Sequence, residues 1–161
     1  MRVYVYHTIG MIVCVALQSA WPMWLGVSGC FPDLVLALTL VTGLARGPQE
    51  GFTVGFIGAF LLGSSQGLAF APLFIKLMAV GFAAGLLRGR LVSDRALVAI
   101  MLTFVAIIAV RLVTLVLAPP LGPGMWLKET IIQAPYTAIL AAPMFSAVNI
   151  LNRDYPLRID R

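Results

Sequence analysis

The chain has 161 residues, of which 61% are hydrophobic and only 11% are charged. Soluble domains average about 45–50% apolar and about 25% charged residues, so a soluble enzyme, a disordered chain and a nucleic-acid-binding domain are excluded. Eleven Lys and Arg residues stand against six Asp and Glu residues, and in a membrane protein such cations first report topology. The composition predicts one all-α integral membrane domain over residues 1–161, with room for six transmembrane helices at most.

The first apolar run, residues 3–25, is long enough to cross about 30 Å of hydrocarbon. Arg2 precedes it, as in a signal peptide, but Gln18 stands three residues before any cut after Ala20, which makes a poor cleavage site. We therefore expect a membrane span. Cys14 and Cys30 would differ in depth by roughly 20 Å along a helix, too far for a disulfide, so we expect both to be small apolar side chains.

The second and third runs, residues 31–45 and 48–63, are short and flank the turn Arg46-Gly47-Pro48. Pro48 suits the first position of a helix, and Glu50 suits its first turn. Two interpretations compete: a pair of short spans, or a re-entrant hairpin that would leave Arg46 and Glu50 near the middle of the membrane. Because a central Arg costs about 2.5–3.5 kcal/mol, we expect two short spans joined by a cytoplasmic turn, with bilayer thinning or burial absorbing the mismatch.

Three further runs cover residues 71–87, 96–118 and 127–151. Pro135 and Pro143 interrupt the last run, and prolines are tolerated inside membrane helices when neighbours satisfy the freed carbonyls. If the N-terminus is cytoplasmic, only Lys128 falls on the outer side, whereas eight arginines fall inside: Arg2, Arg46, Arg88, Arg90, Arg95, Arg153, Arg158 and Arg161. This asymmetry predicts six spans with both termini cytoplasmic.

Seven polar residues map to the outer half or outer rim of these spans: Gln18, Asp33, Gln66, Lys76, Arg111, Glu129 and Gln133. Intramembrane charges usually pair or line a cavity, so the pattern predicts a polar, outward-facing concavity between helices. The alternative is that Lys76 and Arg111 extend to the outer headgroups. Because Arg111 lies roughly 12 Å deep at 1.5 Å per residue, we expect it to form an ion pair with Asp33; Lys76 is the next candidate partner.

Small residues recur every four positions in three series along the predicted helices. They are Gly43, Gly47, Gly51 and Gly55 across the second and third spans, Gly81, Gly85 and Gly89 on the fourth, and Ala134, Ala138 and Ala142 on the sixth. Such spacing lets helix backbones approach one another, within the chain or against a partner. We expect internal packing, except that Gly47 is better explained by the turn.

No constellation of catalytic or metal-binding residues is recognisable. Ser65 lies at the outer end of the third span and His7 at the inner end of the first, whereas a nucleophile and its base must approach within about 3 Å. The sequence contains no His-x-x-Glu-His, paired-cysteine or phosphate-loop motif. We therefore expect no catalytic residues, no cofactor and no metal.

A group of motifs lies between residues 32 and 91, and it begins with Pro32-Asp33-Leu34 at the start of a short span. This tripeptide resembles the Pro-Asp-Leu start of a short span in the rod shape-determining protein MreD family. Arg46-Gly47-Pro48, followed by Glu50-Gly51 and then by Gly55-Phe56 and Gly58, is similar to its Arg-Gly-x-x-Glu-Gly…Gly-Phe stretch. Gly81, Gly85 and the exit Arg88-Gly89-Arg90 continue the likeness. The family often has an Asp in the loop after the third span, where this chain has Gln66.

The resemblance implies a non-enzymatic component of the bacterial inner membrane that takes part in lateral cell-wall elongation. Such a protein would bind MreC and belong to a wider complex with MreB, RodZ, the RodA glycosyltransferase and its transpeptidase partner. The family is similar in fold to the substrate-binding S-components of energy-coupling-factor vitamin transporters, which supply the alternative function. Here the outer loops are short and poor in ligand-type side chains, which favours the interaction protein over the solute-binding subunit.

Overall fold

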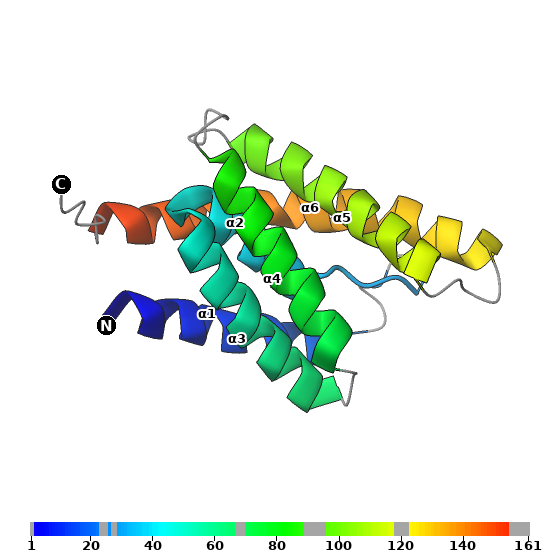
Figure 1. Cartoon of the computed structure of the whole chain (residues 1–161), viewed down its shortest axis with the longest axis horizontal. Helices are drawn as coiled ribbons and strands as arrows, with labels where there is room; N and C mark the ends of the chain where they lie inside the picture. Colours follow the sequence, from blue (N-terminus) through cyan, green and yellow to red (C-terminus); the bar gives the residue numbers. More distant parts are fainter. Residues whose placement is uncertain are drawn as a thin grey trace.

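The computed structural model describes residues 2–22, 26, 29–66, 70–88, 96–117 and 123–154, and these ranges form six α-helices (Figure 1). In chain order they are α1 (Arg2–Ser19), α2 (Leu34–Arg46), α3 (Pro48–Gln66), α4 (Phe70–Leu87), α5 (Ala96–Leu117) and α6 (Pro123–Asp154). The predicted all-α class and the order of the six elements are confirmed. Cys14 and Cys30 are buried and unbonded, as expected.

Among the described residues, three helices are long and apolar enough to cross a membrane, with candidate spans at Phe70–Leu87, Ala96–Val116 and Trp126–Ile150. Their outward faces are apolar as well: Ile75 on α4 is 72% exposed and Val116 on α5 is 82% exposed. Large apolar surfaces of this kind mark contact with a membrane or a partner rather than with water. These features show the general character of a membrane protein.

The helix α2 lies at the centre of the molecule and contacts all five other helices. Every residue from Leu34 to Arg46 is buried. The hydroxyl groups of Thr39 and Thr42 donate hydrogen bonds to carbonyls of their own helix, Val35 O and Leu38 O, each at 2.8 Å. Because these two buried hydroxyl groups are satisfied within the helix, this part of α2 can be surrounded by apolar neighbours.

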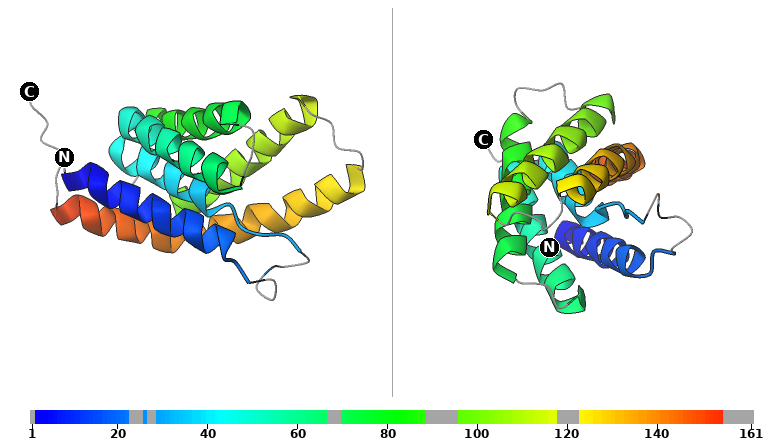
Figure 2. Two further views of the ribbon diagram at one scale, coloured as in Figure 1. Left: turned by 90° about the horizontal axis from the view of Figure 1, so that it is seen from below. Right: turned by 90° about the vertical axis from the view of Figure 1, so that its right-hand side faces the viewer.

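The helices alternate in direction, so that α1 begins at the end of the molecule where α2, α4 and α6 finish (Figure 2). We call this the inner end, and the opposite end, where α1, α3 and α5 finish, the outer end. The turn between α2 and α3 lies at the inner end. Gly47 has φ 109° and ψ −179° there, a conformation essentially restricted to glycine, and Pro48 begins α3 as predicted.

The first predicted span extends beyond the end of the helix that the structure contains. A helix over residues 3–25 was expected, but α1 ends at Ser19 and the chain is not helical at Ala20, Trp21 and Pro22. Proline disfavours helical conformation in the residue before it, which explains a stop ahead of Pro22. Likewise, α2 begins at Leu34 rather than at residue 31, because Asp33 is its N-cap.

The helices α3 and α6 are longer than their predicted apolar runs, whereas α4 and α5 match theirs to within one residue. The helix α3 continues to Gln66 and α6 covers Pro123–Asp154, without interruption at Pro135 or Pro143. At 1.5 Å per residue, α2 is only about 20 Å long whereas α6 is about 48 Å long. Hydropathy alone missed these helix ends, because polar residues at the ends of α3 and α6 are helical although they lie outside the apolar runs.

Candidate functional site: a polar network at the start of α2

The carboxylate of Asp33 caps the N-terminus of α2. Its Oδ1 accepts a hydrogen bond from the backbone N–H of Leu36 at 3.0 Å, which satisfies one of the donors left free in the first turn of a helix. The backbone N–H of Asp33 donates to Oγ1 of Thr137 on α6 at 3.1 Å. Both interactions are buried, and the bond to Thr137 fixes the start of the central helix against α6.

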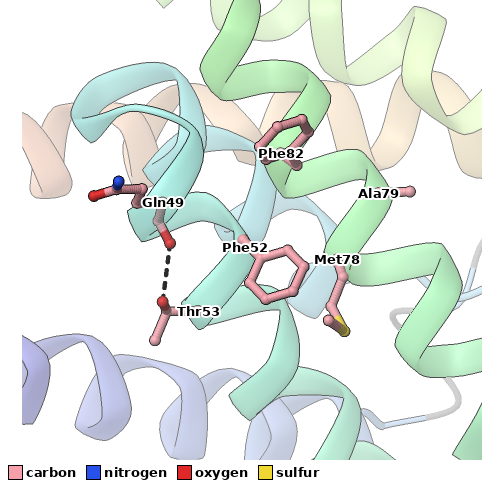
Figure 3. Close-up of a pocket in the computed structure, with 6 residues that line it drawn as sticks. All are labelled: Gln49, Phe52, Thr53, Met78, Ala79 and Phe82. Carbon is pink, nitrogen blue, oxygen red and sulfur yellow. Dashed lines mark hydrogen bonds between the residues drawn. The ribbon is translucent and has the colours of Figure 1, made fainter.

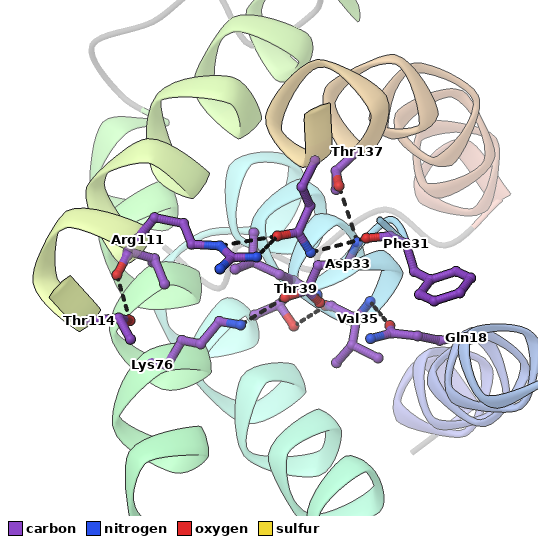
Figure 4. A network of polar contacts seen from close by, with 12 residues as sticks. Gln18, Phe31, Asp33, Val35, Thr39, Lys76, Arg111, Thr114 and Thr137 are labelled. Carbon is purple, nitrogen blue, oxygen red and sulfur yellow. Dashed lines mark hydrogen bonds and ion pairs between the residues drawn. The ribbon is translucent and has the colours of Figure 1, made fainter. Parts of the chain in front are cut away.

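Lys76 on α4 provides the cation that neutralises Asp33. Its Nζ lies 2.7 Å from Oδ2 of Asp33, and the two side chains are 29% and 11% exposed. Figure 4 shows Lys76 reaching from α4 toward the first turn of α2. The two oxygens of the Asp33 carboxylate thus serve different helices, one capping α2 and the other binding α4.

Arg111 on α5 binds α6 instead. Its Nε donates to Oε1 of Gln133 at 3.1 Å, and Nη2 donates to the same oxygen. Its Nη1 lies 3.2 Å from Oε2 of Glu129. The amide of Gln133 in turn donates to the carbonyl of Phe31 at 3.1 Å, so Gln133 connects Arg111 to the segment that leads into α2.

The predicted ion pair between Asp33 and Arg111 is therefore wrong. Asp33 forms its ion pair with Lys76, the second candidate, and Arg111 forms its ion pair with Glu129. The physical reason is that α5 packs closely against α6. The Arg111 guanidinium therefore lies next to acceptors on α6 and not next to the carboxylate at the start of α2.

The helix α1 approaches the same point from the opposite side. The Oε1 of Gln18 accepts a hydrogen bond from the backbone N–H of Val35 at 3.3 Å, a second free donor of the first turn of α2 (Figure 4). Trp21 packs edge-on against Tyr136 of α6, with ring centroids 6.4 Å apart. We call the linked side chains the outer polar network: Gln18, Asp33, Lys76, Arg111, Glu129, Gln133 and Thr137.

Six of the seven polar residues selected from the sequence belong to this network. The seventh, Gln66, is the last residue of α3, and its side chain lies outside the described part of the structure. Two features of the network were not predicted from the sequence: the participation of Thr137 and the contact of Gln18 with Val35. No sequence pattern could have indicated either feature. Thr137 is a single threonine within a helix, and the partner of Gln18 is a backbone N–H group, which every residue except proline has.

A cavity of about 240 Å³ adjoins the network at the outer end. It is lined by Gln18 from α1, by Arg111 from α5, by Glu129 and Gln133 from α6, and by residues 29–32 ahead of α2. Its lining combines polar side chains with the apolar segment before α2. The predicted polar concavity between helices is therefore present, although Lys76 does not line it.

The glycines selected from the sequence lie where α2, α3 and α4 meet. A methyl group built on Gly43 or on Gly51 would overlap the carbonyl oxygen of Gly81, and one on Gly81 would overlap that of Gly51. A methyl group on Gly55 would lie 2.6 Å from Leu77 O, and one on Gly85 would overlap Pro48. These backbones touch within the chain, which only glycine permits.

The small residues selected on α6 also lie buried at contacts between helices. Ala134 and Ala138 are almost fully buried on the helix that packs against α2 and α5.

At the inner turn, Arg46 is 5% exposed, Pro48 begins α3, and Glu50 lies half-buried in the first turn of α3. Arg46 is thus enclosed by protein at the end of α2.

A second cavity, of about 670 Å³, lies on the exposed face of the α3–α4 pair (Figure 3). Its lining residues are Gln49, Phe52, Thr53, Met78, Ala79 and Phe82. This cavity was not predicted from the sequence. The spacing of Phe52, Phe56 and Phe60, four residues apart, is the signal that could have indicated an exposed aromatic stripe on α3.

Comparisons of the chain with protein-family models, with curated proteins and with solved structures found no match. Among the described residues, no group of three or more His, Cys, Asp or Glu side chains could hold a metal ion. The arrangement at the start of α2 therefore has to be interpreted from its own chemistry: it joins α1, α4, α5 and α6 to one buried helix end.

Proposed function

We propose that this chain is a non-enzymatic membrane component of the bacterial cell-elongation complex, of the MreD type. The observation that carries the proposal is the structural use of the motif residues between 32 and 91. Asp33 caps the central helix, Gly47 makes the inner turn, and Gly51 and Gly81 allow α3 and α4 to touch. The residues that carry the resemblance are those that this helix arrangement needs.

In this proposal, all six helices cross the inner membrane and both termini are cytoplasmic. The arrangement of the helices supports this orientation, because Arg2 begins α1, Arg46 ends α2 and Arg88 directly follows α4, all at the inner end (Figure 2). Positive residues at one end are typical of a cytoplasmic side. The short α2 is buried on all sides, so its neighbours rather than lipid absorb the length mismatch.

The proposed partners follow from the resemblance. MreC is the direct partner, and MreB, RodZ, RodA and its transpeptidase belong to the wider complex, with the lipid bilayer as the surrounding medium. The role is one of binding and positioning rather than catalysis. In support, His7 lies near the start of α1 and Ser65 near the end of α3, at opposite ends of the molecule, so they cannot act as base and nucleophile.

A second candidate is a solute-binding subunit of the energy-coupling-factor type. The observation that favours it is the cavity at the outer end, into which side chains of three helices converge. Ligand sites of membrane bundles are built in this way from facing helices. The two candidates differ in what they need: an elongation component needs MreC, whereas a transporter subunit needs an energising partner and a transported solute.

The deciding experiment is complementation of a rod-shaped bacterium depleted of its own MreD, with MreC from the same source co-expressed. Restored rod shape, together with co-purification of MreC in mild detergent, is the expected result. Gly81→Leu provides the matched control, because it should abolish folding and therefore both readouts. If the wild-type chain is inserted at normal levels but neither restores rod shape nor retains MreC, the proposed function is wrong.

A further inference from the structure

The cavity beside the outer polar network retains unused hydrogen-bonding groups. A guanidinium carries five N–H donors, and Arg111 uses three of them, one on each nitrogen, toward Gln133 and Glu129. Two N–H groups therefore have no partner among the described residues. Glu129 accepts through Oε2 alone, which leaves Oε1 without a donor in the same part of the chain.

Gln18 adds a third group to the lining. Its Oε1 is occupied by the backbone N–H of Val35, whereas its NH₂ group donates to no other described residue. An amide NH₂ group without an acceptor at the wall of a cavity can donate a hydrogen bond to a ligand atom. The lining thus offers two kinds of donors, from Arg111 and Gln18, and one acceptor, from Glu129.

The charges of the lining select the class of ligand. Arg111 and Glu129 lie 3.2 Å apart and their charges cancel, so a simple anion at Arg111 would be repelled by Glu129 and a simple cation by Arg111. A molecule that carries both charges on neighbouring atoms avoids this conflict, because each charge meets its opposite. An α-amino acid has this arrangement.

The size of the cavity sets an upper limit on that molecule. A volume of about 240 Å³ corresponds to roughly eight water molecules at about 30 Å³ each. This is below the range of about 300–1,000 Å³ that is usual for drug-sized ligands. The Glu129 side chain is 47% exposed, so a small polar molecule can reach the pair from the outer end.

We propose that this cavity binds a small zwitterion of the α-amino-acid class. The ligand carboxylate accepts hydrogen bonds from the two unused N–H groups of Arg111, and its ammonium group binds Glu129. Gln18 then faces the remaining atoms of the ligand from across the cavity. The proposal does not depend on the elongation function, because the residues that support that function do not line this cavity. It deepens the second candidate, the solute-binding subunit, for which the same cavity is the ligand site.

Isothermal titration calorimetry on the full chain in lipid nanodiscs tests the proposal, with glycine, alanine, serine and glutamine as probes. We expect saturable binding of at least one of them. Acetate and methylammonium, each of which carries only half of the ligand's charge pattern, should bind about tenfold more weakly or not at all, since each charged contact contributes at least about a factor of ten.

Glu129→Gln should weaken binding of the same probe about tenfold or more while leaving the protein folded, since Glu129 is half-exposed. Arg111→Lys keeps the charge but loses the paired N–H groups, and it should weaken binding to a similar degree. Thr114→Val is the matched control, because this exposed α5 residue bonds only to Val110 O of its own helix. Absence of binding at millimolar concentrations, or binding that both Glu129→Gln and Arg111→Lys leave unchanged, would overturn the proposal. Equal binding of acetate would overturn it too, by showing a simple anion site.

Discussion

The Nζ of Lys76 lies 2.7 Å from Oδ2 of Asp33, and this ion pair joins α4 to the N-terminus of the central helix. The same carboxylate caps α2 through its other oxygen. Asp33 therefore combines a local role within its helix with a tertiary role between helices, and the two roles can be separated by mutation.

Lys76→Met should lower the free energy of unfolding by about 1–3 kcal/mol, because it leaves the mostly buried Asp33 carboxylate without its cation. The double variant Asp33→Asn with Lys76→Met should recover part of this loss, since asparagine is also a good N-cap and carries no charge. Denaturant unfolding in detergent micelles provides the measurement. Lys128→Met, at an exposed position on α6, is the control; a double variant less stable than Lys76→Met would contradict the pairing.

Gln133→Leu should destabilise the outer end of α5 and α6 by about 1.5–3 kcal/mol, because Arg111 loses an acceptor that receives two of its N–H groups. The carbonyl of Phe31 loses its donor as well. Hydrogen exchange of the first turns of α6 would report this loosening. Ile131→Ala, at an exposed α6 position, should leave exchange at these sites unchanged, and equal effects of the two variants would refute the role of Gln133.

Gly81→Ala should destabilise the protein by about 1–3 kcal/mol or more, because its methyl group would overlap the carbonyl of Gly51 and approach Cγ2 of Thr39 at 2.8 Å. Gly10→Ala on α1 is the control, since its methyl group would meet only Leu38 at 3.9 Å. That change should be neutral or stabilising by about 0.5–1 kcal/mol through helix propensity. Thermal unfolding followed by circular dichroism distinguishes the two, and similar midpoints would rule out the proposed glycine contact.

Gly47→Ala should cost about 1–3 kcal/mol for a conformational reason alone, because the φ of 109° is unfavourable for any side chain. The space at this position is adequate, since a methyl group would come no closer than 3.6 Å to the Arg88 guanidinium. Gly47→Asn should be no better than Gly47→Ala, since this backbone region is essentially restricted to glycine. Rescue by asparagine in the same unfolding assay would show that the turn adopts another conformation.

Labelling of single cysteines tests the proposed topology. Arg46 would be a poor probe because it is buried, whereas Gln49 at the start of α3 and Gly124 at the start of α6 are exposed and lie at opposite ends of the molecule. In a background without Cys14 and Cys30, a membrane-impermeant maleimide should label Gly124→Cys from the periplasm and spare Gln49→Cys until the membrane is permeabilised. The reverse pattern would invert the proposed orientation.

The sequence by itself determined the all-α class, the general character of a membrane protein, the order of the six helices, and the end of the molecule at which the polar network lies. These features are local, because hydropathy and composition act on each segment separately and a helix advances by a fixed rise per residue. The start of α3 was also accessible through Pro48 and Glu50, whereas the predicted start of α2 was three residues too early. The end of α1 was missed because the apolar run continues beyond Pro22, although the helix does not.

Only the tertiary structure decided which polar residues meet. Asp33, Lys76 and Arg111 all lie in the outer half, so depth alone could not distinguish the Asp33–Lys76 pair from the Asp33–Arg111 pair. The choice depends on which helices touch: the contact of Gly43 with Gly81 holds α4 against α2, whereas Arg111 lies on the helix that packs most closely with α6. Helix rotation and neighbour choice are set by packing across the whole chain, and no single segment encodes them.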